Sequence, residues 1–262
     1  MRRRMLHRTM VAALVSWLLT LCAVSVPPFL AYLVAASAYD NDTQSLNLVA
    51  TNTTTFSHTA AGSERAITVC VMLTGTTQTV SSITYGGTGL SSIGSGNFGA
   101  VGRIEAWGLA ASATGANNVV VTLSAANAAW DASAVSYTGA NQSGGTSTFN
   151  GFQSAGNASG SDTSIAVTVT STTNDLVSDC ALSVNGNGTT SSPGTQRWQD
   201  NSGLTNTQGQ TAAGATTVTT TETYDSVAGT TNQYNLVGFN VVGSGAGTTS
   251  TPTLTLLGVG PG

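Results

Sequence analysis

The sequence contains no lysine, and only 7% of its 262 residues are charged. An ordinary soluble protein has roughly 25% charged residues, so this chain has few groups for ionic contacts. Four of its seven arginines lie within the first eight positions, which leaves three against eleven acidic residues in the rest of the chain. A body with this excess of negative charge lacks a basic patch for phosphates, and we expect no binding to nucleic acid.

Histidine is almost as scarce, because only His7 and His58 occur. His58 has no carboxylate beside it in the sequence, and the chain lacks both a GxSxG elbow and the E-x-D-x-x-E pattern of concanavalin-like glycosidases. Glu105 shares one strand face with Arg103 and Trp107, an arrangement typical of a surface ion pair beside an aromatic ring. We therefore expect a protein that is not an enzyme.

A metal centre is equally hard to build from these residues. One histidine and two distant cysteines do not give a zinc site of known spacing. Asp40-Asn41-Asp42 and Asp200-Asn201 offer oxygen ligands of the kind that calcium prefers, but short Asp/Asn clusters also form ordinary turns. No calcium-loop motif is present, so the sequence predicts no metal and no cofactor.

Three cysteines occur, at positions 22, 70 and 180. Cys22 lies in the hydrophobic N-terminal segment, so Cys70 and Cys180 are the one pair available to the rest of the chain. Both fall in predicted strands. They form either a disulfide in an oxidising compartment or two separate buried thiols, since the distance between their Cα atoms decides the matter.

The N-terminus has the features of an export segment. Four arginines precede an uncharged run from Met10 to Ala38, which ends in the small residues Ala36-Ser37-Ala38. This order predicts a hydrophobic export helix over residues 1–38, cleaved after Ala38, and a secreted or cell-surface protein. The run is longer than an ordinary signal, so a membrane anchor through residues 10–38 is the alternative; Pro27-Pro28 favours the signal. We expect membrane contact through this segment alone.

The remaining chain alternates between apolar and polar residues. Ile67, Val69, Val71 and Leu73 share one face, and similar patterns recur between turn signals rich in Gly, Asn and Ser. Such alternation predicts an all-β domain over residues 39–243, an antiparallel two-sheet β-sandwich of the jelly-roll type with about eleven strands. Residues 244–262 read as a flexible Gly/Ser/Thr/Pro tail. Its apolar patch Leu254–Val259 could alternatively be a strand donated to a neighbouring subunit.

Several signatures follow one another in a recognisable order: SSITYGGTGL, RIEAWGLAASATGANNVVVTLS, IAVTVTSTTNDLVSDC and YNLVGFNVV. In order and spacing, the stretch from Phe56 to Val242 resembles a recurrent β-sandwich domain of secreted bacterial proteins and phage structural proteins. The resemblance implies a jelly-roll sandwich that is concanavalin-like or similar to a carbohydrate-binding module. It implies no catalytic residue, because the family has no assigned activity.

Aromatic residues are the candidates for ligand binding. Trp130 and Trp198 stand at strand edges beside polar residues, with Arg197 next to Trp198 and Trp107 on a further strand. Exposed indoles could stack on sugar rings, whereas a sandwich of this size would more simply bury them. The series Thr217, Thr219, Thr221 and Thr223 places four hydroxyls on one strand face, either a flat polar binding surface or an ordinary solvent-facing strand.

Two functions are compatible with these features. The first is a structural or assembly protein of a cell surface, filament or virion, which associates with itself or with similar proteins. Monomeric sheets usually protect their edges with charges, particularly lysine, and this chain has none. The second is a carbohydrate-binding or adhesion module. The first is the prediction favoured here.

Overall fold

The computed structural model describes residues 35–98, 102–157, 162–184, 186–202, 206–225 and 233–246. These residues form antiparallel β-sheets joined by turns and two short 3-10 segments, η1 (Gly145–Ser147) and η2 (Ser244–Ala246). The predicted all-β class is therefore confirmed. In the part of the chain that is described, no helix has the length and apolar character to cross a membrane. The predicted export helix and most of the predicted tail lie outside the described residues.

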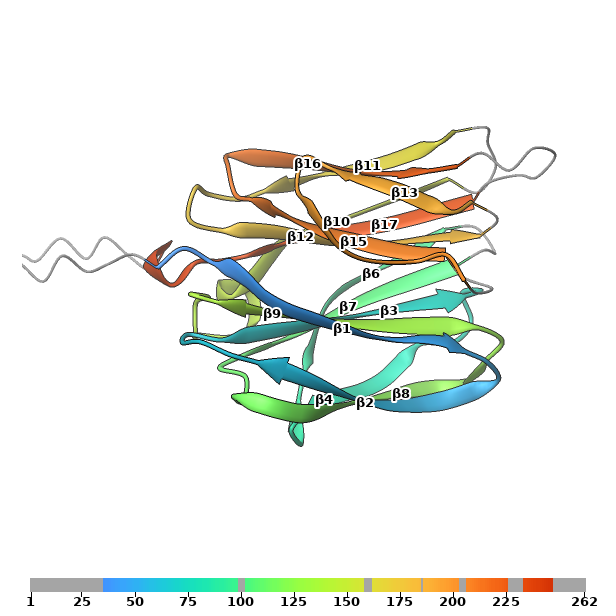
Figure 1. Ribbon diagram of the computed structural model, residues 1–262, viewed down its shortest axis with the longest axis horizontal. Helices are drawn as coiled ribbons and strands as arrows, with labels where there is room; N and C mark the ends of the chain where they lie inside the picture. The colour runs from blue at the N-terminus through green and yellow to red at the C-terminus, as the bar shows by residue number, and fades with distance from the viewer. Residues whose placement is uncertain are drawn as a thin grey trace, which may run out of the picture. The chain divides into compact units, whose positions relative to one another are not determined.

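The strands form four sheets, which Figure 1 shows stacked in layers. Two sheets come from the first half of the chain. The outer one contains β2 (Thr51–Ala60), β8 (Gly115–Asn127), β4 (Val80–Tyr85) and β5 (Thr88–Gly89), in that order. The inner one contains β1 (Ala38–Leu48), β9 (Trp130–Thr138), β3 (Ala66–Thr74), β7 (Gly102–Ala110) and β6 (Ser91–Phe98). We call this pair of sheets the first sandwich.

The second half of the chain forms the second sandwich. Its inner sheet contains β10 (Phe149–Asn157), β17 (Gln233–Val241), β12 (Leu176–Val184), β15 (Asn206–Ala213) and β14 (Thr195–Asp200). Its outer sheet contains β11 (Ser164–Thr170), β16 (Thr217–Tyr224) and β13 (Gly188–Ser192). The sequence predicted one pair of packed sheets; the structure has two pairs.

The two sandwiches repeat one strand order. Reading each inner sheet from edge to edge, β1-β9-β3-β7-β6 corresponds strand for strand to β10-β17-β12-β15-β14. In the outer sheets, β2-β8-β4 corresponds to β11-β16-β13. The duplication is hidden in the sequence because alternation and turns specify it, while the side chains themselves differ.

Three apolar cores separate the four sheets. Strand β3 is buried on both faces: Ile67, Val69 and Val71 pack inside the first sandwich, while Cys70 and Met72 pack into the central core between the two inner sheets. Strand β12 does the same in the second sandwich. These strands read as nearly continuous apolar runs because water reaches neither face.

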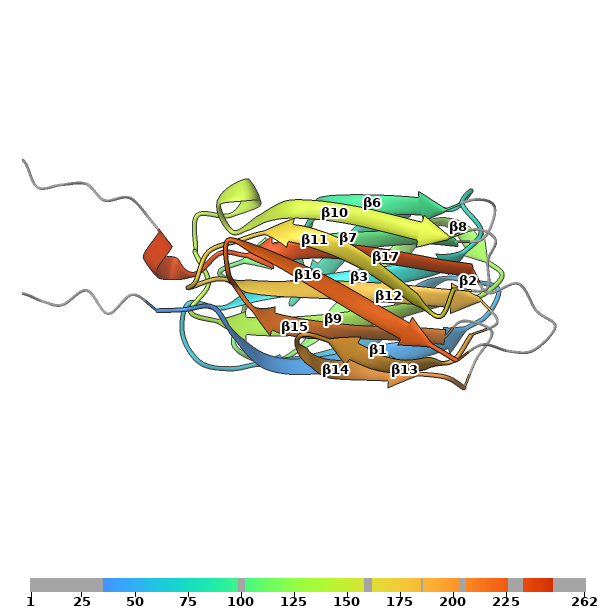
Figure 2. The ribbon, with the colours of Figure 1, turned by 90° about the horizontal axis from the view of Figure 1, so that it is seen from above.

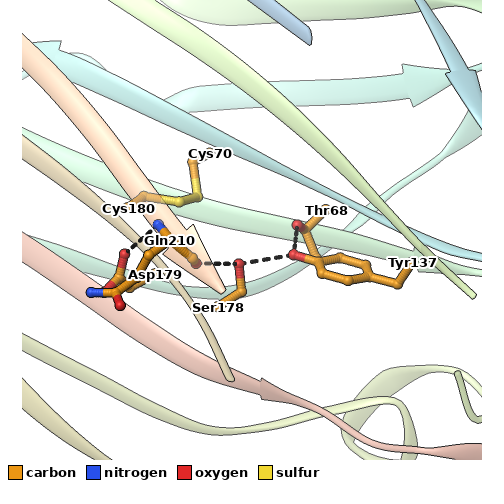
Figure 3. Close-up of a disulfide and its surroundings, with 7 residues drawn as sticks. All are labelled: Thr68, Cys70, Tyr137, Ser178, Asp179, Cys180 and Gln210. Carbon is orange, nitrogen blue, oxygen red and sulfur yellow. Dashed lines mark hydrogen bonds between the residues drawn. A yellow bond between two sulfur atoms is a disulfide. The ribbon is translucent and has the colours of Figure 1, made fainter. Parts of the chain in front are cut away.

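A disulfide joins the sandwiches at equivalent positions. Cys70 is the fifth residue of β3, Cys180 is the fifth residue of β12, and their Cα atoms lie 6.5 Å apart (Figure 3). The bond spans 110 residues of sequence. In the chain-entropy model, a loop of that length stabilises the folded state by about 5 kcal/mol. Of the two possibilities left open by the sequence, the disulfide is the one present.

Hydrogen bonds cross the same central core beside the disulfide (Figure 3). The Tyr137 hydroxyl shares a hydrogen bond of 2.9 Å with the Thr68 hydroxyl and donates one of 2.9 Å to the Ser178 hydroxyl. Burial raises the pKa of Tyr137 to about 12, so it remains a neutral donor. These hydroxyls form a hydrogen-bonded chain from one inner sheet to the other. Because the interface around them is apolar, the chain favours one alignment of the two sheets.

Candidate functional site

The tryptophans predicted to bind sugar lie in the interior. Trp130 is 0% exposed, and its indole nitrogen donates to the Thr51 carbonyl at 3.1 Å. Trp198 is 5% exposed and belongs to the central core. Among the described residues, the one exposed large hydrophobic side chain is Val49. Sugar stacking requires an open ring face, so the structure favours the alternative that these indoles are core residues.

Arg197 connects the two sandwiches rather than facing an open surface. Its guanidinium lies 3.8 Å from the centre of the Tyr39 ring, a cation–π contact between β14 and β1. Its Nε atom also donates to the Thr211 hydroxyl at 2.7 Å. The Tyr39 hydroxyl in turn donates to Asp42. Arg197 therefore stabilises packing between β1 and β14.

Arg103, Glu105 and Trp107 share a face, as their spacing predicts. The Arg103 Nε and Glu105 Oε1 atoms are 2.6 Å apart, and the Trp107 indole nitrogen donates to Glu105 Oε2 at 3.2 Å. The backbone amide of Val80 donates to Oε1 as well, at 3.0 Å. Glu105 is only 4% exposed. Its carboxylate is occupied by these structural contacts, which differs from the solvated surface pair that the sequence suggested.

The Asp/Asn clusters considered for calcium bind protein groups instead. Asp40 Oδ2 accepts from the Ala61 amide and the Ser136 hydroxyl, at 2.8 and 2.7 Å. Asp200 Oδ1 accepts from the amide and hydroxyl of Ser202. No group of three or more His, Cys, Asp or Glu residues suited to a metal occurs among the described residues. These carboxylates hold turns and strand ends.

His58 is buried in β2 at 1% exposure. Its Nδ1 atom shares a hydrogen bond of 3.1 Å with the Thr43 hydroxyl, and its ring lies edge-on to Tyr85. Burial lowers the pKa of His58, although the charges of Asp40 and Asp42 oppose that shift. The imidazole is therefore a neutral core group, and no Ser-His-Asp arrangement forms around it in the described part of the chain.

A carboxyl pair that sequence reasoning missed lies inside the second sandwich. Asp179 in β12 and Glu222 in β16 are 1% and 0% exposed, and the charge of Asp179 acts directly on the Glu222 carboxyl. Glu222 also accepts from the Ser191 hydroxyl at 2.6 Å and from Gln210 Nε2 at 3.0 Å. The backbone amide of Gln210 donates to Asp179 Oδ1 at 3.0 Å (Figure 3). Four strands thus contribute to one buried polar cluster.

The environment of this pair favours a bound proton. Burial, and after it the charge of Asp179, raise the pKa of Glu222 to about 10. Burial also raises the pKa of Asp179, to about 6. Two carboxylates cannot both ionise so close together in a poorly solvated site, so Glu222 retains a proton at neutral pH and the pair carries one negative charge.

The pattern around these residues contained a usable signal. Asp179 shares a strand face with Val177 and Ala181, and Glu222 alternates out of phase with the exposed threonines of β16. Both carboxyls were thus predictable as inward-facing. Their proximity was not, because it depends on the pairing of sheets.

The carboxyl pair is enclosed in the core of the second sandwich. The stacked rings of Tyr224 and Tyr234, with centres 4.5 Å apart, lie in the same core. A small cavity of about 110 Å³ opens elsewhere, between β6, β7, η1 and β10. Its lining consists of Ile93, Phe149 and small residues, without a titratable side chain.

Hydroxyl groups cover the outer faces of both outer sheets. Thr217 and Thr219 of β16 are exposed, and Thr219 shares a hydrogen bond of 2.8 Å with Thr168 of β11. Across the first sandwich, the exposed side chains of β2 are Thr51, Asn52, Thr53, Thr55, Ser57 and Thr59. Neither set carries a charge, so the predicted threonine ladder is part of a wider set of uncharged exposed side chains. Figure 2 looks onto the second sandwich, where β16 pairs with β11.

No family model, curated protein or solved structure matches the chain. Its function must therefore be inferred from its own residues.

Proposed function

We propose that the protein is an exported, non-catalytic structural protein that assembles with copies of itself at a cell surface or in a filament or virion. The carrying observation is a cross-linked double sandwich that buries Trp130, Trp198 and the carboxyl pair, while its outer sheets present uncharged hydroxyls. Such a molecule has the rigidity of a building block. It offers other copies a surface without charge repulsion.

The strand order supports the same proposal. Consecutive strands in each half pass between the inner and outer sheets, as β1, β2, β3 and β4 do. We infer that each sandwich is a jelly roll, an architecture used by viral capsid and lectin domains. This is a likeness of fold, and it supports a structural role without specifying one.

The sheet edges support self-association. Strand β11 (SIAVTVT) is an edge strand of the second sandwich, and β2 (TNTTTFSHTA) is an edge strand of the first. Neither contains lysine, proline or an acidic residue. Edge strands without such protection can pair with edges of other chains.

Export is supported by the disulfide between Cys70 and Cys180, because structural disulfides persist in oxidising compartments. We propose a secreted or cell-surface location on this basis. The carbohydrate-binding alternative has no comparable support, because Trp130 and Trp198 are buried and the half-buried Trp107 packs against the first core and bonds to Glu105.

Light scattering after size exclusion, with negative-stain microscopy, tests assembly of the exported protein. We expect rings, fibres or sheets, and a strictly monomeric protein at all concentrations would refute the proposal. Thr219→Lys adds a charge to the outer face of β16 and should reduce assembly at least tenfold. Ser143→Lys, in an exposed loop, is the matched control and should assemble normally.

A further inference from the structure

Residues 35–38 belong to the folded body. Ala38 begins β1 and pairs with Thr138 of β9. The backbone amide of Ser37 donates to the Asn174 carbonyl at 2.8 Å, and Ser37 is only 5% exposed. Thr138 lies in the first sandwich and Asn174 lies just before β12 of the second. The short segment therefore contacts both sandwiches.

The surrounding chain accommodates this segment closely. Gly139 has a φ of 64°, and a Cβ atom at this position would lie 2.3 Å from the Ala36 carbonyl oxygen. Only glycine permits that approach. The Ser244 hydroxyl donates to the Ala35 carbonyl at 3.4 Å. Cleavage after Ala38 would remove these contacts and leave the Asn174 carbonyl without its donor.

We propose that the export segment is cleaved after Ser25, so that the mature chain begins at Val26 and retains residues 35–38. This inference rests on the proposed export. The apolar run from Met10 to Leu21 has the length of an ordinary signal core, about 7–15 residues. Ala23 and Ser25 then supply small residues at the third and first positions before the cleaved bond.

This boundary removes a difficulty of cleavage after Ala38. A signal ending at Ala38 has an apolar run much longer than an ordinary one, with two prolines inside it. A signal ending at Ser25 has a run of ordinary length, and Pro27-Pro28 falls after the cleaved bond. Cleavage adds one water across the Ser25–Val26 peptide bond and needs no other reactant.

The test is expression of the full chain in a bacterial host with a general secretion pathway, followed by N-terminal sequencing and intact mass of the exported protein. We expect a mature N-terminus at Val26 and a mass loss of 25 residues. Ser25→Leu should block processing and accumulate the precursor at least tenfold. Ala38→Leu, a change at an exposed position of β1, should be processed like the wild type.

The outcomes separate this inference from the proposed export. A terminus at Tyr39, or a block by Ala38→Leu instead of Ser25→Leu, would overturn the Ser25 site while export stands. Full-length protein held in the membrane with its body outside the cell would also overturn the cleavage. Full-length protein that remains inside the cell would refute the export itself, and the Ser25 site with it.

Discussion

The two sandwiches share a strand order but fill their interiors differently. In the first, Val69 precedes the disulfide cysteine on β3 and packs among apolar side chains, aliphatic and aromatic. In the second, Asp179 occupies the equivalent position on β12 and meets Glu222. The same arrangement of strands therefore holds a buried carboxylate that is ion-paired, Glu105 with Arg103, in one half and a coupled pair of buried carboxyls in the other.

This contrast shows which properties specify the topology. Alternation and turn positions are common to both halves, whereas the chemistry of the inward side chains is not. Every buried carboxyl needs a partner, and the two halves supply it differently, because Glu105 is paired with Arg103 whereas Asp179 and Glu222 have no cation in the described part of the chain. Gln210 meets much of that requirement, since it bonds both carboxyls through its amide and its side chain.

The largest effect is expected from removing the bond between the halves. The double variant Cys70→Ala and Cys180→Ala should lose about 5 kcal/mol of unfolding free energy, because the unfolded chain regains the freedom of a long loop. Urea unfolding followed by circular dichroism measures this loss. We expect the single transition to split, with the polar second sandwich unfolding first. Wild-type protein in reductant is the control, and an unchanged midpoint would contradict the prediction.

The next largest effect is expected from a carboxyl placed at Val69 in the first sandwich. Val69→Asp places a carboxyl at the position equivalent to Asp179, without the partners that Asp179 has. We expect a loss of about 3 kcal/mol at pH 7 in urea unfolding, because the buried charge is unpaired. Val69→Thr, which has nearly the same volume, is the matched control and should lose less. Equal losses in the two variants would show that the site reaches solvent.

The strands could be predicted from the sequence, whereas the way they pair could not. Period-two patterns such as Ile67, Val69 and Val71 predicted strands, because alternation is local. The number of sheets was not predicted, since the division of strands between two sandwiches depends on long-range pairing. For the same reason Cys70 and Cys180 were recognisable only as a possible pair, and Trp130 and Trp198 were equally compatible with a surface or a core.

The carboxyl cluster predicts a smaller effect that depends on pH. Both folded-state pKa values are raised, so the folded protein binds more protons than the unfolded chain above pH 4.5. Stability should therefore fall as pH rises from about 5 towards 9. Glu222→Gln keeps the neutral shape and should flatten this slope.

Urea unfolding at several pH values measures that slope, and Ser191→Ala is its control. This variant removes the hydroxyl that donates to Glu222 but keeps both carboxyls. We expect a small uniform loss of stability, about 1 kcal/mol, with the pH slope preserved. An equal slope in the wild type and in Glu222→Gln would mean that the pair does not hold its proton.

The smallest effect is expected in the first sandwich, and it has the opposite sign. Burial lowers the pKa of His58, so the folded state resists protonation that the unfolded chain accepts. Its contribution to stability is present above the ordinary pKa of 6.5 and is lost as pH falls below it. His58→Gln should remove this acid-side loss. Hydrogen exchange, corrected for intrinsic rates, can follow β2 and β16 separately: acid should deprotect β2 first and alkali should deprotect β16 first. Deprotection of both strands together would show that the halves respond as one cooperative unit despite their different interiors.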